Sequence, residues 1–378
     1  MRTVAHILSY YPGREGLTSF CRGLGVAFQA VDGWSVPIIT FRSKPSKNEL
    51  EREPEVIKFP RRARHPFDIP ASFLSALDGG DLKLDGAVLH GTYSPQAFAI
   101  ARALYKRQLP YIFMPHDPYV KELRRHHAVR KFVYWHLCEK WVLNHAAAVQ
   151  LLSDSHEAPL RELGVKVPVF TLANGCDPAD LIHLDAEARV PGQGADFRIQ
   201  FLGRMDRNHK GLDLLLRGYA KFLESVPEGA NIQLVLSGND WEDRGFLENL
   251  AGSLGIAKRV LFTGRLSEHS INIQSKADLC VLTSRFDGFG LTIVEAMLAS
   301  RPVLVSTKAG IADHVAKSGG GFLVDPDPLS IANGLKEAWK QRADLGQIGE
   351  RGHEYVNNQL TWASVAARST KVYSKFFS

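Results

Sequence analysis

Two carboxylates stand eight positions apart around a glycine-containing turn in the last third of the chain. Asp287 and Glu295 frame the sequence "DGFGLTIVEAM", which follows an apolar stretch at 277–284. That stretch is typical of a buried strand, and the spacing of apolar residues after the turn predicts a helix that begins near residue 291 or 292. The turn and the first helical positions are Gly288, Phe289, Gly290, Leu291 and Thr292.

Both carboxylates are placed to bind hydroxyl groups. The first N–H groups of a helix have no intrahelical partner, and glycines let a ligand approach the backbone closely. Ionised carboxylates accept hydrogen bonds, so Asp287 and Glu295 can hold the hydroxyls of a sugar or a ribose at this helix start. The simpler alternative is that Asp287 caps the turn and that Glu295 interacts with the helix dipole.

Two cations follow another expected strand, at 198–203. The strand runs into "GRMDRNHKG", so Gly203 precedes Arg204, and Lys210 stands just before a predicted helix. Positive side chains beside a helix N-terminus suit a bound phosphate or diphosphate. The alternative is that both are ordinary surface cations in a loop.

Strands and helices alternate along the whole chain, which predicts an α/β protein. The alternation favours two doubly wound, Rossmann-like domains with parallel sheets that face a cleft, and ligands in such sheets lie at the carboxyl ends of strands. We expect a first domain at 1–182, a linker at 183–197 and a second domain at 198–359. The expected strands lie at 3–8, 86–90, 110–114, 146–153, 167–172, 198–203, 231–238, 259–264, 277–284 and 301–306.

The composition, with 45% hydrophobic and 23% charged residues in 378, is that of a globular protein. The four cysteines form no C-x-x-C pair, which favours reduced, buried thiols over a disulfide framework or a zinc site. No charge-free apolar run reaches the ~18 residues of a membrane span, and the N-terminus lacks the pattern of a signal peptide. A cytoplasmic protein is therefore expected.

Positive charge is concentrated in the first half of the chain. Residues 1–180 carry 23 Lys and Arg against 18 Asp and Glu, whereas residues 181–378 carry 23 against 22. The excess gathers at 61–65 and 121–132, which indicates either a solvated face or a patch that meets an anionic membrane or acceptor. No nucleic-acid-binding motif accompanies these runs, so no nucleic-acid partner is expected.

The acid-containing segment resembles the signature of the retaining glycosyltransferases of family 4, "EGFG-x4-EAM-x2-G-x-PV". This chain reads "DGFGLTIVEAMLASRPV", with both acids at the family's spacing. Asp287 replaces the family's first Glu, and Ser300 stands where the family often has Gly. The resemblance implies the GT-B architecture, which is two Rossmann-like domains facing a deep cleft.

Further segments resemble family motifs in the family's order. "LGRMDRNHKG" is similar to its phosphate-binding Arg and Lys, and "MPHDPYV" would place His116 near the donor sugar. "YPGREGLTSF" is similar to the first glycine loop, with both Gly13 and Gly16 as candidates. The loops at 237–240 and 262–268 would hold the nucleotide base through Gly238, Arg265 and Leu266, and the helix at 360–378 would pack back on the first domain.

The resemblance implies a sugar transferred from a UDP- or GDP-sugar with retention of anomeric configuration. Arg204, Lys210 and the amides of 289–292 would stabilise the departing diphosphate, so no metal or other cofactor is expected. Glu295 would bind the ribose, Asp287 the transferred sugar, and His116 the sugar and acceptor. The expected acceptor is a glycan or a lipid-linked molecule of polysaccharide or glycolipid biosynthesis, which would place the protein peripherally at the membrane.

Other functions remain as alternatives. A nucleotide-sugar 2-epimerase or hydrolase shares the architecture, and a non-catalytic basic binding module would explain the charge. A dehydrogenase is disfavoured because no G-x-G-x-x-G with an acid ~20 residues later follows the first strand. The aromatic residues of 126–146 suit either a membrane interface or the core of the first domain.

Overall fold

The computed structural model describes residues 1–8, 16–41, 54–60, 65–116, 119–121, 128–184, 191–192, 196–240 and 242–377. Gly13, most of the basic run at 61–65 and half of that at 121–132 lie outside these ranges, as does part of the expected linker. The chain forms two compact units, Met1–Gly175 with Trp362–Ser378, and Cys176–Thr361. The second unit thus begins several residues before the linker expected at 183–197.

The first unit is built on an eight-stranded parallel sheet. Its strands follow the order β4-β3-β1-β5-β6-β7-β8, and β2 also pairs with β1. The direction of winding reverses between β1 and β5, which makes that pair the switch point of the sheet. The strands are β1 Arg2–Leu8, β2 Trp34–Ser35, β3 Ile38–Thr40, β4 Val56–Lys58, β5 Gly86–His90, β6 Tyr111–Met114, β7 Ala148–Leu151 and β8 Val169–Thr171.

The end of the chain completes the first unit. Helix α16, Trp362–Tyr373, packs against α1, Gly16–Phe28, and the Tyr373 hydroxyl donates a hydrogen bond of 2.9 Å to buried Gln150 of β7. The other helices of this unit are α2 Ala71–Asp78, α3 Pro95–Lys106, α5 Ala128–Tyr134, the π-helix η1 Trp135–Glu139, α6 Lys140–Asn144 and α7 Glu157–Glu162.

The second unit has a six-stranded parallel sheet in the order β11-β10-β9-β12-β13-β14. The chain winds outward from β9 in one direction and from β12 in the other, as in a dinucleotide-binding fold, so the switch point lies between β9 and β12. The strands are β9 Asp196–Leu202, β10 Asn231–Ser237, β11 Val260–Gly264, β12 Leu279–Leu282, β13 Val303–Ser306 and β14 Gly321–Val324.

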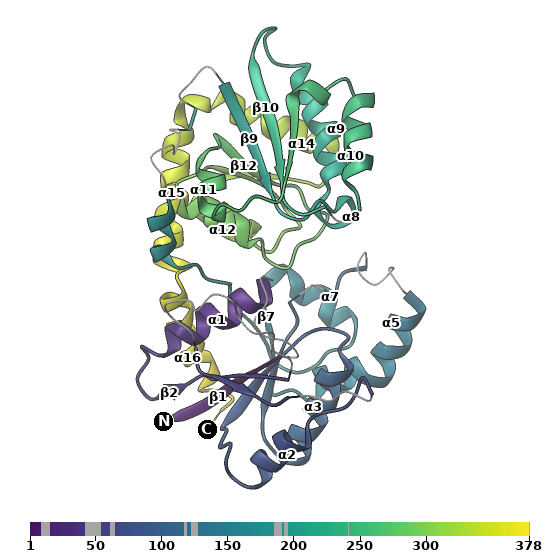
Figure 1. Ribbon diagram of the computed structural model, residues 1–378, viewed down its shortest axis with the longest axis vertical. Coiled ribbons are helices and arrows are strands. Elements are labelled where there is room, and N and C mark those ends of the chain that lie inside the picture. Colours follow the sequence, from purple (N-terminus) through teal and green to yellow (C-terminus); the bar gives the residue numbers. More distant parts are fainter. Residues whose placement is uncertain are drawn as a thin grey trace. The chain divides into compact units, whose positions relative to one another are not determined.

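Helices cover the second sheet in two groups (Figure 1). One group packs α9 against both α10 and α14, and the other joins α12 to α11 and α15. The strands β12 and β13 are buried along their whole length, which explains their continuous apolar sequences. The helices are α8 Arg207–Lys210, α9 Leu212–Leu223, α10 Arg244–Ser253, α11 Ser270–Ser275, α12 Leu291–Leu298, α13 Ala312–Ser318, α14 Pro328–Lys340 and α15 Leu345–Gln359.

The predicted α/β class with two parallel sheets is confirmed, and several details differ. Strands β2, β3, β4 and β14 were not anticipated, nor was the π-helix η1 between α5 and α6. All four cysteines are free and buried, as expected. Within the described ranges, no helix combines the length and hydropathy needed to cross a membrane.

Ser300, the departure from the family's glycine, has a φ of 55°. This left-handed conformation costs an L-residue with a Cβ roughly 1–2 kcal/mol, whereas glycine adopts it freely. We therefore expect Ser300→Gly to raise the free energy of unfolding by about 1 kcal/mol, measured by urea denaturation. Ser253→Gly is the matched control, because Ser253 ends helix α10 and glycine should destabilise it. Destabilisation by Ser300→Gly would contradict the assignment of strain.

Candidate functional site

One predicted cation and one predicted carboxylate of the second unit, Lys210 and Asp287, meet at its switch point. Arg204 and Lys210 follow β9, and Asp287 follows β12, the neighbouring strand in the sheet. The loops that follow parallel strands leave the sheet at the same edge. The side chains of Lys210 and Asp287, which are 77 residues apart in the sequence, are therefore brought together. This is the place where open α/β sheets bind their ligands.

The loop after β9 is fixed by its own cap and by the loop after β12. Asp206 accepts hydrogen bonds from the N–H groups of Asn208 and His209, both at 3.0 Å, and so begins the short helix α8. Gly211 ends that helix at a φ of 63°, and a Cβ there would lie 2.4 Å from the Thr283 carbonyl oxygen. Only glycine therefore permits this approach, which holds Lys210 over the end of β12.

Lys210 and Asp287 form an ion pair. The Lys210 Nζ lies 2.5 Å from the Asp287 Oδ2, and the two side chains are 19% and 12% exposed. Burial alone would raise the pKa of Asp287, but the Lys210 ammonium and hydrogen bonds from Lys210, the Phe289 N–H and Ser284 lower the pKa below its usual value. Asp287 is thus ionised at neutral pH. The sequence did not reveal this pairing.

The turn after Asp287 carries the chain directly into helix α12. Gly290 precedes the helix at a φ of 107°, where a Cβ would lie 2.9 Å from a Leu282 methyl carbon. The loop after β13 braces the turn, since the Ile311 N–H donates to the Phe289 carbonyl at 2.8 Å. Helix α12 begins at Leu291, as predicted, so the amides of 290–292 precede its first regular hydrogen bonds.

Glu295 lies one turn into α12, and its pKa is shifted in the opposite direction from that of Asp287. Burial and, to a lesser extent, the nearby Asp180 raise the pKa of Glu295, and a hydrogen bond from Ser270 partly offsets this, so that the pKa is about 7. The Oε2 of Glu295 is buried and has no hydrogen-bond partner in the described structure. A buried acceptor of this kind is costly unless a ligand supplies a donor.

The predicted base-binding residues follow the two strands beyond β9. Gly238 follows β10 at a φ of 140°, and its N–H donates to the Gly264 carbonyl at 2.9 Å. A Cβ on Gly238 would lie 1.8 Å from the Gly203 carbonyl oxygen, so the ends of β9 and β10 touch. Arg265 and Leu266 come directly after β11, with Arg265 exposed. Arg204 is also exposed.

Two predicted residues belong to the first unit. Gly16 is the first residue of α1, and His116 lies two positions beyond β6. The Nε2 of His116 is 2.9 Å from the Nδ1 of His90, which in turn contacts His6. Neither His6 nor His90 was assigned a role from the sequence. Their positions on β1 and β5, beside the strand before His116, are the signal that could have indicated them.

Removing the Glu295 charge should change how stability depends on pH. A carboxyl whose folded pKa of about 7 exceeds the ordinary 4.5 favours folding below pH 4.5 and loses that contribution as the pH rises through 7. Relative to the unmodified protein, Glu295→Gln should therefore gain stability between pH 5 and pH 8, by at most about 3 kcal/mol. Thermal unfolding at both pH values tests this, with exposed Glu350→Gln as control. A pH-independent difference would contradict it.

Two family models match the chain. Residues 15–175 match the glycosyl transferase 4-like domain, and residues 188–355 match the glycosyl transferases group 1. Mannosylfructose-phosphate synthase of Agrobacterium fabrum is 28% identical over 172 residues, which are 44% of this chain and 37% of that protein. The chain spans about half, or less, of the length of the curated relatives that it matches.

Solved structures match the chain over nearly its full length. Sucrose-phosphate synthase from Thermosynechococcus elongatus has a TM-score of 0.76 at 23% identity, covering 100% of this chain and 99% of that one. HepE of Anabaena, in complex with UDP-glucose, has a TM-score of 0.74 at 19% identity, covering 99% and 100%. These likenesses show the GT-B fold. With the two family models matched in order along it, the chain belongs to the group 1 glycosyltransferases.

Proposed function

We propose that this protein transfers a sugar from a nucleotide-diphospho-sugar, with uracil or guanine as its base, to a hydroxyl of an acceptor. The observation that carries the proposal is the meeting of Lys210, Asp287 and the start of α12 at the switch point of the second sheet. A diphosphate there would contact an ammonium and helix amides, both of which favour negative charge.

The second unit supplies a group for each part of such a donor. Arg204, Lys210 and the amides of 289–292 would bind the diphosphate. The Lys210 ammonium donates one hydrogen bond to Asp287 and has further N–H groups that could donate to the diphosphate. Glu295, with its unpartnered Oε2, would accept hydrogen bonds from the ribose. Asp287 would bind hydroxyls of the transferred sugar. Gly238, Arg265 and Leu266 would lie against the base.

We propose that the reaction needs no metal ion and retains the anomeric configuration. The cations and amides above would stabilise the charge that develops on the leaving diphosphate. Asp287 is held by Lys210, which argues against its use as a nucleophile, so the leaving phosphate would accept the proton of the acceptor hydroxyl on the same face of the sugar. In the first unit, we propose that His116 contacts the substrate and that Gly16 lies in the first glycine loop.

Two other functions would use the same fold. A 2-epimerase or hydrolase would convert the nucleotide-sugar without an acceptor, and a binding module would leave it unchanged. Acceptor-dependent release of the nucleoside diphosphate from a panel of sugar nucleotides distinguishes transfer from both.

A surface of the first unit supports an anionic, partly apolar acceptor. A cavity of about 720 Å³ is lined in part by Lys121, Lys131, Phe132, Trp135 and Lys140. Val129 and Phe132, which line it, and the neighbouring Leu137 are 80%, 66% and 69% exposed. Trp135 is buried, so the aromatic residues of this segment serve both the core and the surface.

We therefore propose a lipid-linked or glycan acceptor for this surface, in polysaccharide or glycolipid synthesis at an anionic membrane. The names of mannosylfructose-phosphate synthase and sucrose-phosphate synthase favour a second candidate, a small phosphorylated sugar. A lipid joined to its glycan through a phosphate and a phosphorylated sugar would each offer a phosphate that the lysines could bind.

Removing either phosphate-binding cation should lower turnover about 10²- to 10³-fold, the usual loss when a charge-stabilising donor is deleted. Lys210→Met and Arg204→Met should also lose more thermal stabilisation by UDP or GDP than by the monophosphates, because the β-phosphate contact is lost. Exposed Lys221→Met is the control, and turnover should persist in EDTA.

A double variant shows whether Lys210 binds the diphosphate itself or only neutralises Asp287. If Lys210 served only to neutralise Asp287, Asp287→Asn would restore diphosphate binding to Lys210→Met. We expect no such restoration. Restored binding, or equal losses for mono- and diphosphates, would contradict the assignment, and loss of turnover in EDTA would contradict metal independence.

The exposed apolar side chains should matter for membrane binding. Replacing Phe132 and Leu137 by Ser should reduce flotation with vesicles that contain phosphatidylglycerol, because apolar surface no longer enters the interface. Leu329→Ser, which alters an equally exposed leucine of the second unit, is the control. Binding should weaken with salt and be absent on pure phosphatidylcholine. No binding of the unmodified protein at low salt would contradict the lipid acceptor and favour the phosphorylated sugar.

A further inference from the structure

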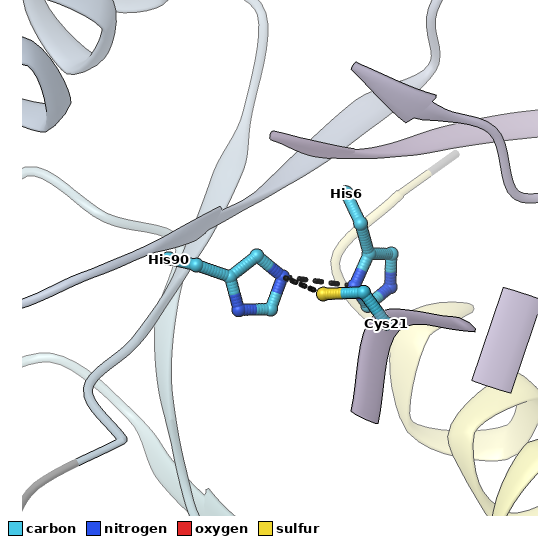
Figure 2. A group of neighbouring side chains, drawn as sticks. All are labelled: His6, Cys21 and His90. Carbon is cyan, nitrogen blue, oxygen red and sulfur yellow. Dashed lines mark hydrogen bonds between the residues drawn. The ribbon is translucent and has the colours of Figure 1, made fainter. Parts of the chain in front are cut away.

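Three histidines of the first unit form a hydrogen-bonded chain across neighbouring strands. His6 Nδ1 lies 2.9 Å from His90 Nε2, and His90 Nδ1 lies 2.9 Å from His116 Nε2. Cys21 of α1 joins the chain, with its Sγ 3.6 Å from His90 Nε2 (Figure 2). The histidines come from β1, the end of β5 and the residues after β6, at the switch point of the first sheet.

All four groups are neutral at neutral pH. Burial is the largest cause in each case, and it lowers the pKa of His6 to about 3, that of His116 to about 4 and that of His90 well below its usual value. Burial raises the pKa of the Cys21 thiol far above its usual value. Each imidazole thus carries one proton, and the sulfur keeps its S–H.

The thiol determines where the proton of His90 resides. His90 Nε2 is the one hydrogen-bond partner of the Cys21 thiol among the described residues. If that nitrogen carried a proton, the S–H would have no acceptor in the interior, and a buried donor without an acceptor is costly. The arrangement therefore favours a lone pair on His90 Nε2, which the Cys21 S–H and the His6 Nδ1–H share as donors, and a proton of His90 on Nδ1.

His6, at the other end of the hydrogen-bonded histidines, favours the same positions for the protons. His6 Nε2 is buried and has no partner in the part of the chain that the structure describes. When His6 donates its Nδ1–H to His90, this nitrogen is a bare lone pair. In the reverse direction it would be an orphaned N–H group, which proteins rarely bury. Both ends of the cluster thus favour protons on the Nδ1 atoms.

A metal site fits this cluster less well. Three potential ligand atoms of His6, Cys21 and His90 lie within 4.8 Å of one another. Two imidazole nitrogens that bind Zn²⁺ at about 2.0–2.1 Å in a tetrahedral site stand roughly 3.3 Å apart. The 2.9 Å between His6 and His90 is instead the length of a hydrogen bond.

We propose that Cys21, acting through His90, holds His116 as the Nδ1–H tautomer, so that His116 offers a neutral hydrogen-bond donor to a substrate oxygen. His90 donates its Nδ1–H to His116 Nε2, which leaves the proton of His116 on Nδ1. His116 cannot then accept a proton at Nδ1, which agrees with a leaving phosphate as the base. Cys21 and His90 are positioning residues, and the substrate contact of His116 rests on the proposed function.

The tautomers are measured directly by long-range ¹H–¹⁵N NMR of the full chain labelled at histidine, near pH 7.5. We expect the ring ¹⁵N resonances of His116 to show a protonated Nδ1 and an unprotonated Nε2. In Cys21→Ala both resonances should shift toward the Nε2–H form, whereas Cys21→Ser, which keeps a donor, should retain the native pattern. Cys280→Ala, at a buried thiol of the second unit, is the control.

Three results would overturn the proposal: an Nε2–H tautomer of His116 in the unmodified protein, an unchanged tautomer in Cys21→Ala, or a stoichiometric shift of the His6 and His90 resonances on adding Zn²⁺. The kinetic readout is separate. We expect Cys21→Ala to lower kcat/KM two- to tenfold, as for one neutral hydrogen bond. If His116→Phe left turnover unchanged while the NMR pattern held, the role of His116 in the proposed function would fail and the tautomer assignment would stand.

Discussion

The ion pair between Lys210 and Asp287 connects the two loops on which the rest of the second unit's site depends. It joins the loops after β9 and β12 across the switch point, with both side chains largely withdrawn from water. Removing one partner of such a pair leaves a buried charge, which is strongly destabilising. The close approach of Gly211 to Thr283 holds the same two loops together through the backbone, so the charges are positioned before any ligand binds.

Asp287 and Glu295 differ in their protonation behaviour. Asp287 has a cation within bonding distance, so its pKa is lowered in spite of burial. No cation contributes to the pKa shift of Glu295, and burial together with the nearby Asp180 raises the pKa of Glu295 to about 7. Opposite shifts of the two pKa values favour different roles for the two carboxylates in the proposed function. Asp287 supports the cation that would meet the diphosphate, and Glu295 keeps a buried oxygen available for a hydroxyl group.

Sequence reasoning was most reliable where one local pattern determines the structure. The strands at 86–90, 231–237 and 260–264 were found because their apolar runs end at glycine or polar residues, and the start of α12 followed from the turn before it. Short strands such as β2 and β3 were missed because two or three residues carry no periodicity. The π-helix η1 was missed because its apolar spacing resembles that of an α-helix.

Contacts between distant segments could not be read from the sequence. The pairing of Lys210 with Asp287, and of His6 with His90 and Cys21, depends on strand order, which a single sequence does not reveal. His90 ends β5 and Asp287 follows β12, so for these two residues the position at a strand end was the available signal, whereas Cys21 and Lys210 lie in helices.

We propose above all that the second unit holds a diphosphate between Arg204, Lys210 and the start of α12. A crystal structure of the complex with UDP or GDP, obtained without divalent cations, tests it most directly. The account predicts a β-phosphate oxygen within about 4 Å of Lys210 Nζ, the range of an ion pair, and facing the amides of 289–292. A diphosphate bound away from these groups, or bound only when a metal ion is added, would contradict it.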